Sequence, residues 1–245
     1  MKSLFDVSGS ANTAQPGWTK FRVIDRGFYT PDRTRGVKAD VQAIALAHTT
    51  GPIIWNIEHW PVPAEQDKFI EIINWVREVR PDLRQGIYSL IPVRNYWGPV
   101  QHALGLRPNS YDAWLRQNAV LAEDGGLANY VDFTCPSLYT FYNSTDSPAF
   151  NLEELWHDFA RLTIVEAKKY KKPVYPFIWP RFHPSAHPTM PPMRETAFVA
   201  QLETVLTHAD GVCVWDDGAQ KIKFDYSVEQ IMREIAKRNI AGEFE

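Results

Sequence analysis

Residues 51–61 read Gly-Pro-Ile-Ile-Trp-Asn-Ile-Glu-His-Trp-Pro, and this stretch indicates both the fold and the chemistry of the chain. Its apolar run, 52–55, is typical of a strand buried on both faces, as in a parallel sheet. Because side chains alternate along a strand, Asn56, Glu58 and Trp60 should share one face. The stretch therefore predicts an amide, a carboxyl and an indole together at the carboxyl end of a buried strand.

Similar apolar runs alternate with helical segments along the chain. Apolar residues at helical spacing predict helices at 38–48, 64–80, 111–123, 152–170, 194–208 and 228–239. Short apolar runs predict strands at 20–25, 51–57, 86–91, 130–139, 173–179 and 211–215. Such alternation requires parallel strands joined by helical crossovers. We expect an α/β fold, a shortened or irregular TIM-like (β/α) barrel with parallel strands.

The long loops follow the predicted strands, and in barrels of this kind these loops build the active site. A doubly wound sheet is the alternative, but the sequence has no GxGxxG phosphate loop to support it. The chain has 245 residues, which is tight for eight barrel units. We expect one domain over 1–245, with residues 1–17 irregular because they are small and polar.

Composition narrows the classes of function. The net charge is −3, with a pI near 6.2, so no basic field points to nucleic acid. No run is long enough to span a membrane, and the N-terminus lacks the apolar stretch of a leader peptide. We expect a cytoplasmic protein, or a secreted one whose leader has been removed. The sequence leaves its oligomeric state open.

Polar and aromatic side chains gather at the predicted strand ends. If the barrel closes, these ends meet at one rim. Nine of the chain's residues are Trp, and such a surplus suits either a Trp-rich core or stacking on sugar rings. Beside Asn56, Glu58 and Trp60, the substrate-binding candidates are Tyr88, Asp132, Tyr139, Tyr142, Trp179, Arg181, Trp215 and Asp216.

Glycoside hydrolysis needs an acid for the leaving oxygen and a group that stabilises positive charge at the anomeric carbon. Glu58 is the candidate acid, and aromatic neighbours that exclude water would favour its protonated form. In substrate-assisted enzymes the substrate's acetamido oxygen is the second group, and Asn56 is suited to orient it. The alternative is a conventional carboxylate pair, Glu58 with Asp216 or Asp132. A non-catalytic carbohydrate-binding protein is the alternative outside enzymes.

Other chemistries have less support. His183 and His187 have the spacing of a helical metal pair, but Pro184 and Pro188 disfavour a helix there. No Gly-x-Ser-x-Gly motif occurs, and the two cysteines lie in apolar segments, which predicts buried free thiols. We therefore expect an oligo- or polysaccharide substrate, no cofactor and no metal.

The strand-end segments also resemble the hyaluronidase family. Residues 56–61 resemble the motif Asp-Trp-Glu-x-Trp-Arg-Pro, and residues 133–139 resemble Phe-Pro-Asp-Cys-Tyr. Residues 173–182 resemble Val-Tyr-x-Tyr-x-Arg-Pro-Arg-Tyr, and residues 211–216 resemble Gly-x-Val-x-Trp-Gly. All four segments occur in the family's order.

The resemblance implies a barrel and a retaining, substrate-assisted mechanism. In it, Glu58 would be the proton donor, Tyr139 would hold the acetamido group and Trp215 would floor the sugar subsite. Asn56 stands where the family has Asp, and endo-β-N-acetylglucosaminidases of the Asn-x-Glu type show that asparagine can fill this place. Trp179 stands where the family has Arg, and the family's disulfide pattern is missing, so the glycan stays unassigned.

Overall fold

The computed structural model describes residues 1–7, 16–49, 51–106, 108–141, 152–184, 189, 191–215 and 225–244. Its strands are short and pair in parallel: β1 (Ser3–Asp6), β2 (Thr19–Lys20), β3 (Arg22–Ile24), β4 (Ile53–Trp55), β5 (Gln85–Ile87), β6 (Phe177–Ile178) and β7 (Gly211–Val214). The helices are α1 (Lys38–Ala47), α2 (Gln66–Val79), α3 (Gly98–Ala103), α4 (Pro108–Ala122), α5 (Leu152–Lys168), α6 (Glu195–His208), α7 (Val228–Ile240) and the 3₁₀ turn η1 (Leu127–Asn129).

Two sheets, ordered β2-β1-β7-β6 and β3-β4-β5, join into a ring. On one side Phe21 alone separates β2 from β3, so one segment pairs with β1 and then with β4. On the other side, parallel bridges join Cys135 to Tyr88 and Ser137 to Phe177. The described strands thus close into an irregular (β/α) barrel, which confirms the predicted fold class.

The sequence predicts a regular strand at 130–139, but the structure shows only single bridges there. Pro136 and Pro176 lie at this junction, and neither has an N–H to donate to a ladder. Their carbonyl oxygens still accept hydrogen bonds at 2.8 Å, from the backbone N–H groups of Phe177 and Cys213 respectively. At this junction the barrel is therefore closed by hydrogen bonds to the proline carbonyl oxygens, and the neighbouring strands are short.

Residues 1–17 are not irregular throughout, because Ser3–Asp6 form β1, which pairs with both β2 and β7. Leu4 and Phe5 are buried by this pairing. Gly211 permits the close approach of β7, since a Cβ at this position would overlap the backbone oxygen of Ser3. The partner strand, which is distant in sequence, makes this stretch a strand.

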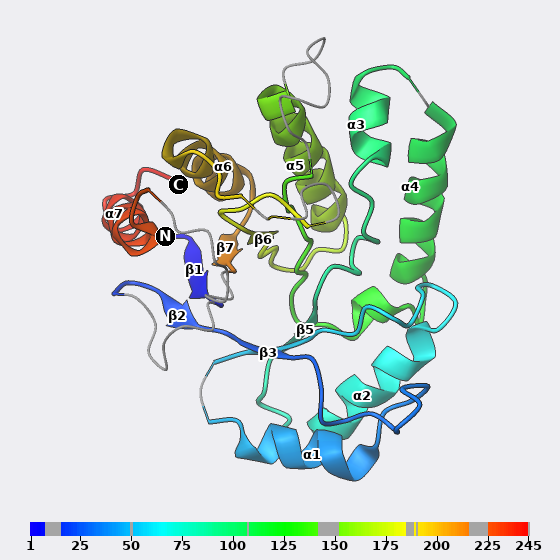
Figure 1. The fold of residues 1–245 in the computed structure, drawn as a ribbon. Coiled ribbons are helices and arrows are strands. Elements are labelled where there is room, and N and C mark those ends of the chain that lie inside the picture. The colour runs from blue at the N-terminus through cyan, green and yellow to red at the C-terminus, as the bar shows by residue number, and fades with distance from the viewer. Residues whose placement is uncertain are drawn as a thin grey trace.

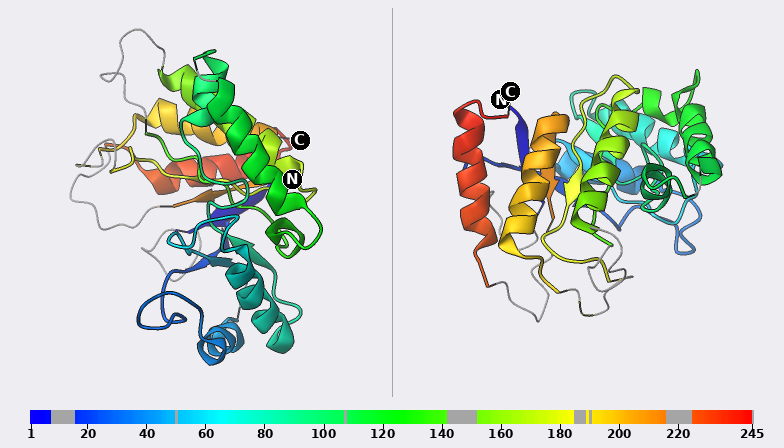
Figure 2. Two further views of the ribbon diagram at one scale, coloured as in Figure 1. Left: turned by 90° about the vertical axis from the view of Figure 1, so that its right-hand side faces the viewer. Right: turned by 90° about the horizontal axis from the view of Figure 1, so that it is seen from above.

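The last helix holds the first strand in place. The carboxamide of Asn239 on α7 accepts a hydrogen bond from the Lys2 backbone N–H and donates one to the Lys2 oxygen, both at 2.8 Å. The two ends of the chain accordingly lie close together (Figure 2).

Aromatic rings fill the barrel on the amino side of its strands. They are Phe5, Phe21, Phe133 and Tyr175, with ring centroids 4.0 to 5.5 Å apart between contacting neighbours. Since they come from separate strand positions and touch one another, they lie inside the ring. These four rings therefore form part of the packed interior of the barrel.

The helices cover the outside of the barrel, with α5, α6 and α7 on one side and α1 and α2 on the opposite side (Figure 1). The predicted apolar face of α2 is buried as expected. Helix α3 lies between the predicted strand at 86–91 and the predicted helix at 111–123, where the sequence predicts no helix. Within the described ranges, no helix combines the length and the apolar character that a membrane span requires.

Candidate active site at the carboxyl ends of the strands

Several candidate residues follow directly after barrel strands. Asn56 follows β4, Tyr88 follows β5, Trp179 follows β6 and Trp215 follows β7. In a closed parallel barrel these positions meet at one rim, as the sequence predicts. We call this set of strand ends, with the loops that follow them, the carboxyl rim.

Glu58 lies on the carboxyl rim and is open to solvent, with 44% of its side chain exposed. The Nη1 of Arg94 donates a hydrogen bond to its Oε2. This environment differs from the expected water-excluding aromatic surroundings. Arg94 is 36 residues away in sequence, in the loop after β5, and no sequence pattern links the two.

The charge of Glu58 reaches the aromatic residues of the rim. Burial raises the pKa of Tyr88, Tyr96 and Tyr139, and the charge of Glu58 is a smaller cause in the same direction for each. Burial and the charge of Arg94 lower the pKa of His183, and Glu58 partly opposes them. Glu58 and Tyr139, predicted as partners, therefore lie in one electrostatic neighbourhood.

A network of hydroxyl groups lies beside this carboxylate. Ser137 Oγ is 3.1 Å from the hydroxyl of Tyr88 and 2.7 Å from that of Tyr96. The hydroxyl of Tyr88 also shares a hydrogen bond with that of Tyr139, and Tyr96 shares one with Arg94. Because burial raises the pKa of these phenols, they are neutral groups that can donate hydrogen bonds to a ligand.

Stacked rings form one side of the rim. The ring centroid of Trp179 is 5.4 Å from that of Tyr139, and His183 stacks on Phe141 at 4.1 Å. Trp179 is almost fully buried. Flat aromatic surfaces beside hydroxyl donors are a combination that suits the apolar faces and polar edges of sugar rings.

Two buried polar atoms that belong to the first residue after a barrel strand have no hydrogen-bond partner among the described residues: Oδ1 of Asn56 and Nε1 of Trp179. Buried polar atoms in proteins are nearly always paired, so each exception requires an explanation. Both belong to residues placed immediately after a barrel strand, β4 and β6.

Trp60 does not join the rim. The strand ends at Trp55 and the chain turns at Glu58, so the expected alternation no longer holds. Trp60 is buried, its Nε1 donates to the Arg33 backbone oxygen at 2.8 Å, and its ring packs on Phe69 at 5.3 Å. Trp60 therefore packs in the core beside α2 and does not lie at the rim, where the sequence predicts contact with substrate.

Asp132 lies at the opposite end of the barrel. Its Oδ2 accepts a hydrogen bond at 2.7 Å from the backbone N–H of Gln85, the first residue of β5. Its Oδ1 lies 3.6 Å from the Arg77 guanidinium. Asp132 thus caps the amino end of a strand, about three residues or ~10 Å from the carboxyl rim, and the expected role as substrate ligand or second carboxylate is wrong.

Of the four remaining candidates, the structure describes Arg181 and Trp215. Arg181 is buried and forms a backbone bridge with Pro192. Trp215 is half-buried against the core, and its backbone N–H donates to the Ile178 oxygen at 3.0 Å. Tyr142 and Asp216 lie outside the described residues. Among all the residues that the structure describes, no three His, Cys, Asp or Glu side chains are placed to hold a metal ion together.

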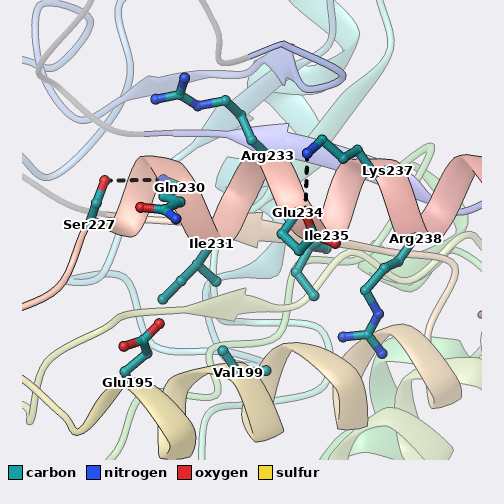
Figure 3. A pocket seen from close by; sticks show the side chains of 10 residues that line it. All are labelled: Glu195, Val199, Ser227, Gln230, Ile231, Arg233, Glu234, Ile235, Lys237 and Arg238. Atoms are coloured by element: carbon teal, nitrogen blue, oxygen red, sulfur yellow. Dashed lines mark hydrogen bonds and ion pairs between the residues drawn. The ribbon is translucent and has the colours of Figure 1, made fainter.

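A hollow of about 610 Å³ lies elsewhere, between α6 and α7 (Figure 3). Its lining mixes charges of both signs with an aliphatic floor and includes no residue of the carboxyl rim. The lining residues are Glu195, Val199, Ser227, Gln230, Ile231, Arg233, Glu234, Ile235, Lys237 and Arg238. This hollow is therefore separate from the candidate site.

Comparison of the sequence with protein-family models and with curated proteins finds no match. The structure is similar to that of bee venom hyaluronidase in complex with a hyaluronic acid tetramer, with a TM-score of 0.54 and 13% identity over 91% of this chain and 86% of that chain. A monoclinic crystal structure of bee venom hyaluronidase gives a TM-score of 0.46 and 15% identity over 92% of this chain and 70% of that chain. At 13% identity the likeness concerns the fold, and the chain has a distant hyaluronidase-like barrel, as its strand-end segments predict.

Proposed function

We propose that this protein is a glycoside hydrolase that cleaves an N-acetylhexosamine-containing glycan with retention of configuration. Glu58 is the general acid and base, and Asn56 orients the substrate's acetamido group. The observation that carries the proposal is the buried, unpartnered Oδ1 of Asn56, two residues from an exposed carboxylate. An acetamido N–H is a donor that would satisfy this oxygen.

The chemistry follows from these two groups. With its N–H bonded to Asn56, the acetamido group would turn its carbonyl oxygen toward the anomeric carbon. That oxygen forms a bond to the anomeric carbon while the glycosidic bond breaks and Glu58 gives its proton to the leaving oxygen. Water then attacks the same carbon, the bond to the acetamido oxygen breaks, and Glu58 takes the proton from water.

The other rim residues support binding of a sugar. Tyr88 and Tyr139 offer neutral phenol hydroxyls, and Trp179 offers an unpartnered N–H beside an aromatic face. Arg181 and Trp215 are further substrate-binding candidates on the segments after β6 and β7. The fold is similar to a hyaluronidase that was crystallised with an oligosaccharide, which supports a glycan ligand.

Two alternatives are kept as outcomes of the experiment. The first is a conventional carboxylate pair on a non-acetylated glycan, with Asp216 as the second acid, since the position of Asp132 removes that candidate. The second is a carbohydrate-binding protein without turnover.

The deciding experiment measures release of reducing ends from matched oligosaccharides with and without acetamido groups. We expect cleavage of the acetylated set alone and inhibition by a thiazoline mimic of the cyclised acetamido group. Glu58→Gln should lose at least ~10²-fold in rate and keep its glycan affinity. Glu203→Gln is the matched control, because Glu203 is 41% exposed and also paired with an arginine, far from the rim.

Each alternative predicts a different pattern. Rapid cleavage of the plain oligosaccharides would indicate paired carboxylates. Glycan binding without any cleavage by the unmodified protein would indicate a binding protein. Equal activity of Glu58→Gln and Glu203→Gln would remove Glu58 from the mechanism.

A further inference from the structure

The ion pair between Arg94 and Glu58 uses only one oxygen of the carboxylate. Nη1 of Arg94 bonds to Oε2, and Oε1 accepts no hydrogen bond from the described residues. The Glu58 side chain as a whole is 44% exposed. Arg94 therefore holds one oxygen, and the described residues leave the other without a hydrogen bond.

The backbone on either side of Arg94 is fixed by side chains of neighbouring helices. The Val93 N–H donates to Oδ1 of Asn118 at 2.8 Å, and the Val93 oxygen accepts from Nε1 of Trp114 at 2.6 Å. Both partners belong to α4, and Asn118 is fully buried. The segment that carries Arg94 is therefore attached to the helical layer just before the arginine.

The same segment is fixed again after the arginine. Oδ1 of Asn95 accepts hydrogen bonds from the N–H groups of Trp97 at 3.2 Å and Gly98 at 2.7 Å, where α3 begins. The next residue, Tyr96, bonds to Ser137 at 2.7 Å. A rigid base and a planar guanidinium are what is needed to hold a carboxylate in one orientation.

We propose that Arg94 is the positioning residue of Glu58: it holds Oε2 so that Oε1 faces the glycosidic oxygen. This inference rests on the proposed role of Glu58 as the acid. A glutamate that is nearly half exposed samples several rotamers, and each wrong rotamer moves the proton away from its target. A half-exposed ion pair adds at most ~1 kcal/mol to stability, so the pair matters for rate more than for folding.

Arg94→Met tests the proposal kinetically. We expect kcat to fall about 100-fold with KM changed less than about threefold, since misplacement of a catalytic group affects the chemical step. Arg94→Lys should recover only part of kcat, because it keeps the charge and loses the planar fork. Arg238→Met is the control, since Arg238 is 28% exposed and pairs with Glu203 across α6 and α7 at 2.7 Å.

Chemical rescue separates positioning from a structural role. Adding guanidinium ion at ~50 mM, far below denaturing concentration, should raise kcat of Arg94→Ala several-fold and leave Glu58→Gln and Arg238→Met unchanged. Absence of rescue together with a kcat near that of the unmodified protein in Arg94→Met would overturn the proposal.

A second measurement needs no activity, so that its failure is distinct from failure of the proposed function. Side-chain couplings of Glu58 in the isotopically labelled protein report its rotamers. We expect one rotamer in the unmodified protein and averaging in Arg94→Met. A single rotamer in both proteins would refute the positioning role, even if the unmodified protein is an active enzyme. If Arg94→Met shows averaging but the unmodified protein cleaves no glycan, only the glycosidase assignment is refuted.

Discussion

The hydroxyl oxygen of Ser137 lies 3.1 Å from the hydroxyl oxygen of Tyr88, and this contact joins the segment after β5 to the strand position that closes the barrel. Both residues are buried. The hydroxyl of Tyr96 reaches the same serine oxygen from the loop that carries Arg94. One small side chain thus links two walls of the carboxyl rim.

Ser137→Ala should therefore destabilise the fold. The substitution removes the shared partner of two phenols, and a buried hydroxyl left without its bond costs about 1–3 kcal/mol. Urea unfolding of the two proteins measures the difference. In the double variant with Tyr88→Phe, part of the loss should return, because the phenol that lost its partner is also gone. Strict additivity of the two changes would contradict the network.

Asn56→Leu should separate stability from function. Oδ1 of Asn56 is buried without a partner, so a similar-sized apolar side chain removes an unsatisfied group and should leave the free energy of unfolding unchanged or raised by ~1 kcal/mol. Cleavage of acetylated oligosaccharides should fall by ~10²-fold or more, since nothing then holds the acetamido group.

Asn118→Leu is the matched control for that substitution. Asn118 is fully buried and its Nδ2 has no partner among the described residues, but its Oδ1 accepts the N–H of Val93. Removing it orphans a backbone donor and should cost about 1–3 kcal/mol. Equal stability losses in both variants would mean that the Asn56 carboxamide is already satisfied in the free protein.

The sequence predicts the fold well where the signal is local. The amphipathic face of α2 depends on residues three and four apart, so the pattern marks the helix to within two residues at its start. The parallel barrel follows from the order of such segments. By contrast, β1 has only four residues, and its pairing with β7 depends on the close approach that Gly211 permits, far away in sequence.

The candidate site shows the same division. Placing Glu58 and Tyr139 near each other requires only strand order and barrel closure. Arg94 was not predicted because its pairing with Glu58 depends on a fixed loop anchored to α4. Trp60 was misplaced because the alternation of side chains stops where β4 ends. Asp132 was misplaced because a polar residue next to a strand can lie at either end of a barrel.

The two cysteines should resist thiol reagents. Cys135 and Cys213 are free and fully buried, and burial, with a hydrogen bond to Cys135 as the next cause, raises the pKa of the Cys213 thiol. Because the thiolate is the reactive form, neither should be labelled by Ellman's reagent at pH 8 over many minutes. Unfolding in ~6 M guanidinium chloride should release both. Stoichiometric labelling of the folded protein would contradict this burial.

Stability should fall on mild acidification, and His48 gives the clearest reason. Burial lowers the pKa of His48, the charges of Arg22 and Arg80 act in the same direction, and a hydrogen bond to the Gly51 oxygen partly opposes them. The unfolded chain, with its histidine pKa near ~6.5, then binds protons that the folded protein does not. Stability is complete above that pH and declines as the pH falls toward the folded pKa.

His48→Gln should reduce this decline. Glutamine can still donate to the Gly51 oxygen but binds no proton, so its urea midpoint should drop less than that of the unmodified protein between pH 7.5 and 5.5. His59→Gln, which changes an exposed histidine, should follow the unmodified protein. If His48→Gln loses as much stability as the control over that range, another group carries the acid sensitivity, and His183, whose pKa is also lowered by burial and by Arg94, is the next to substitute.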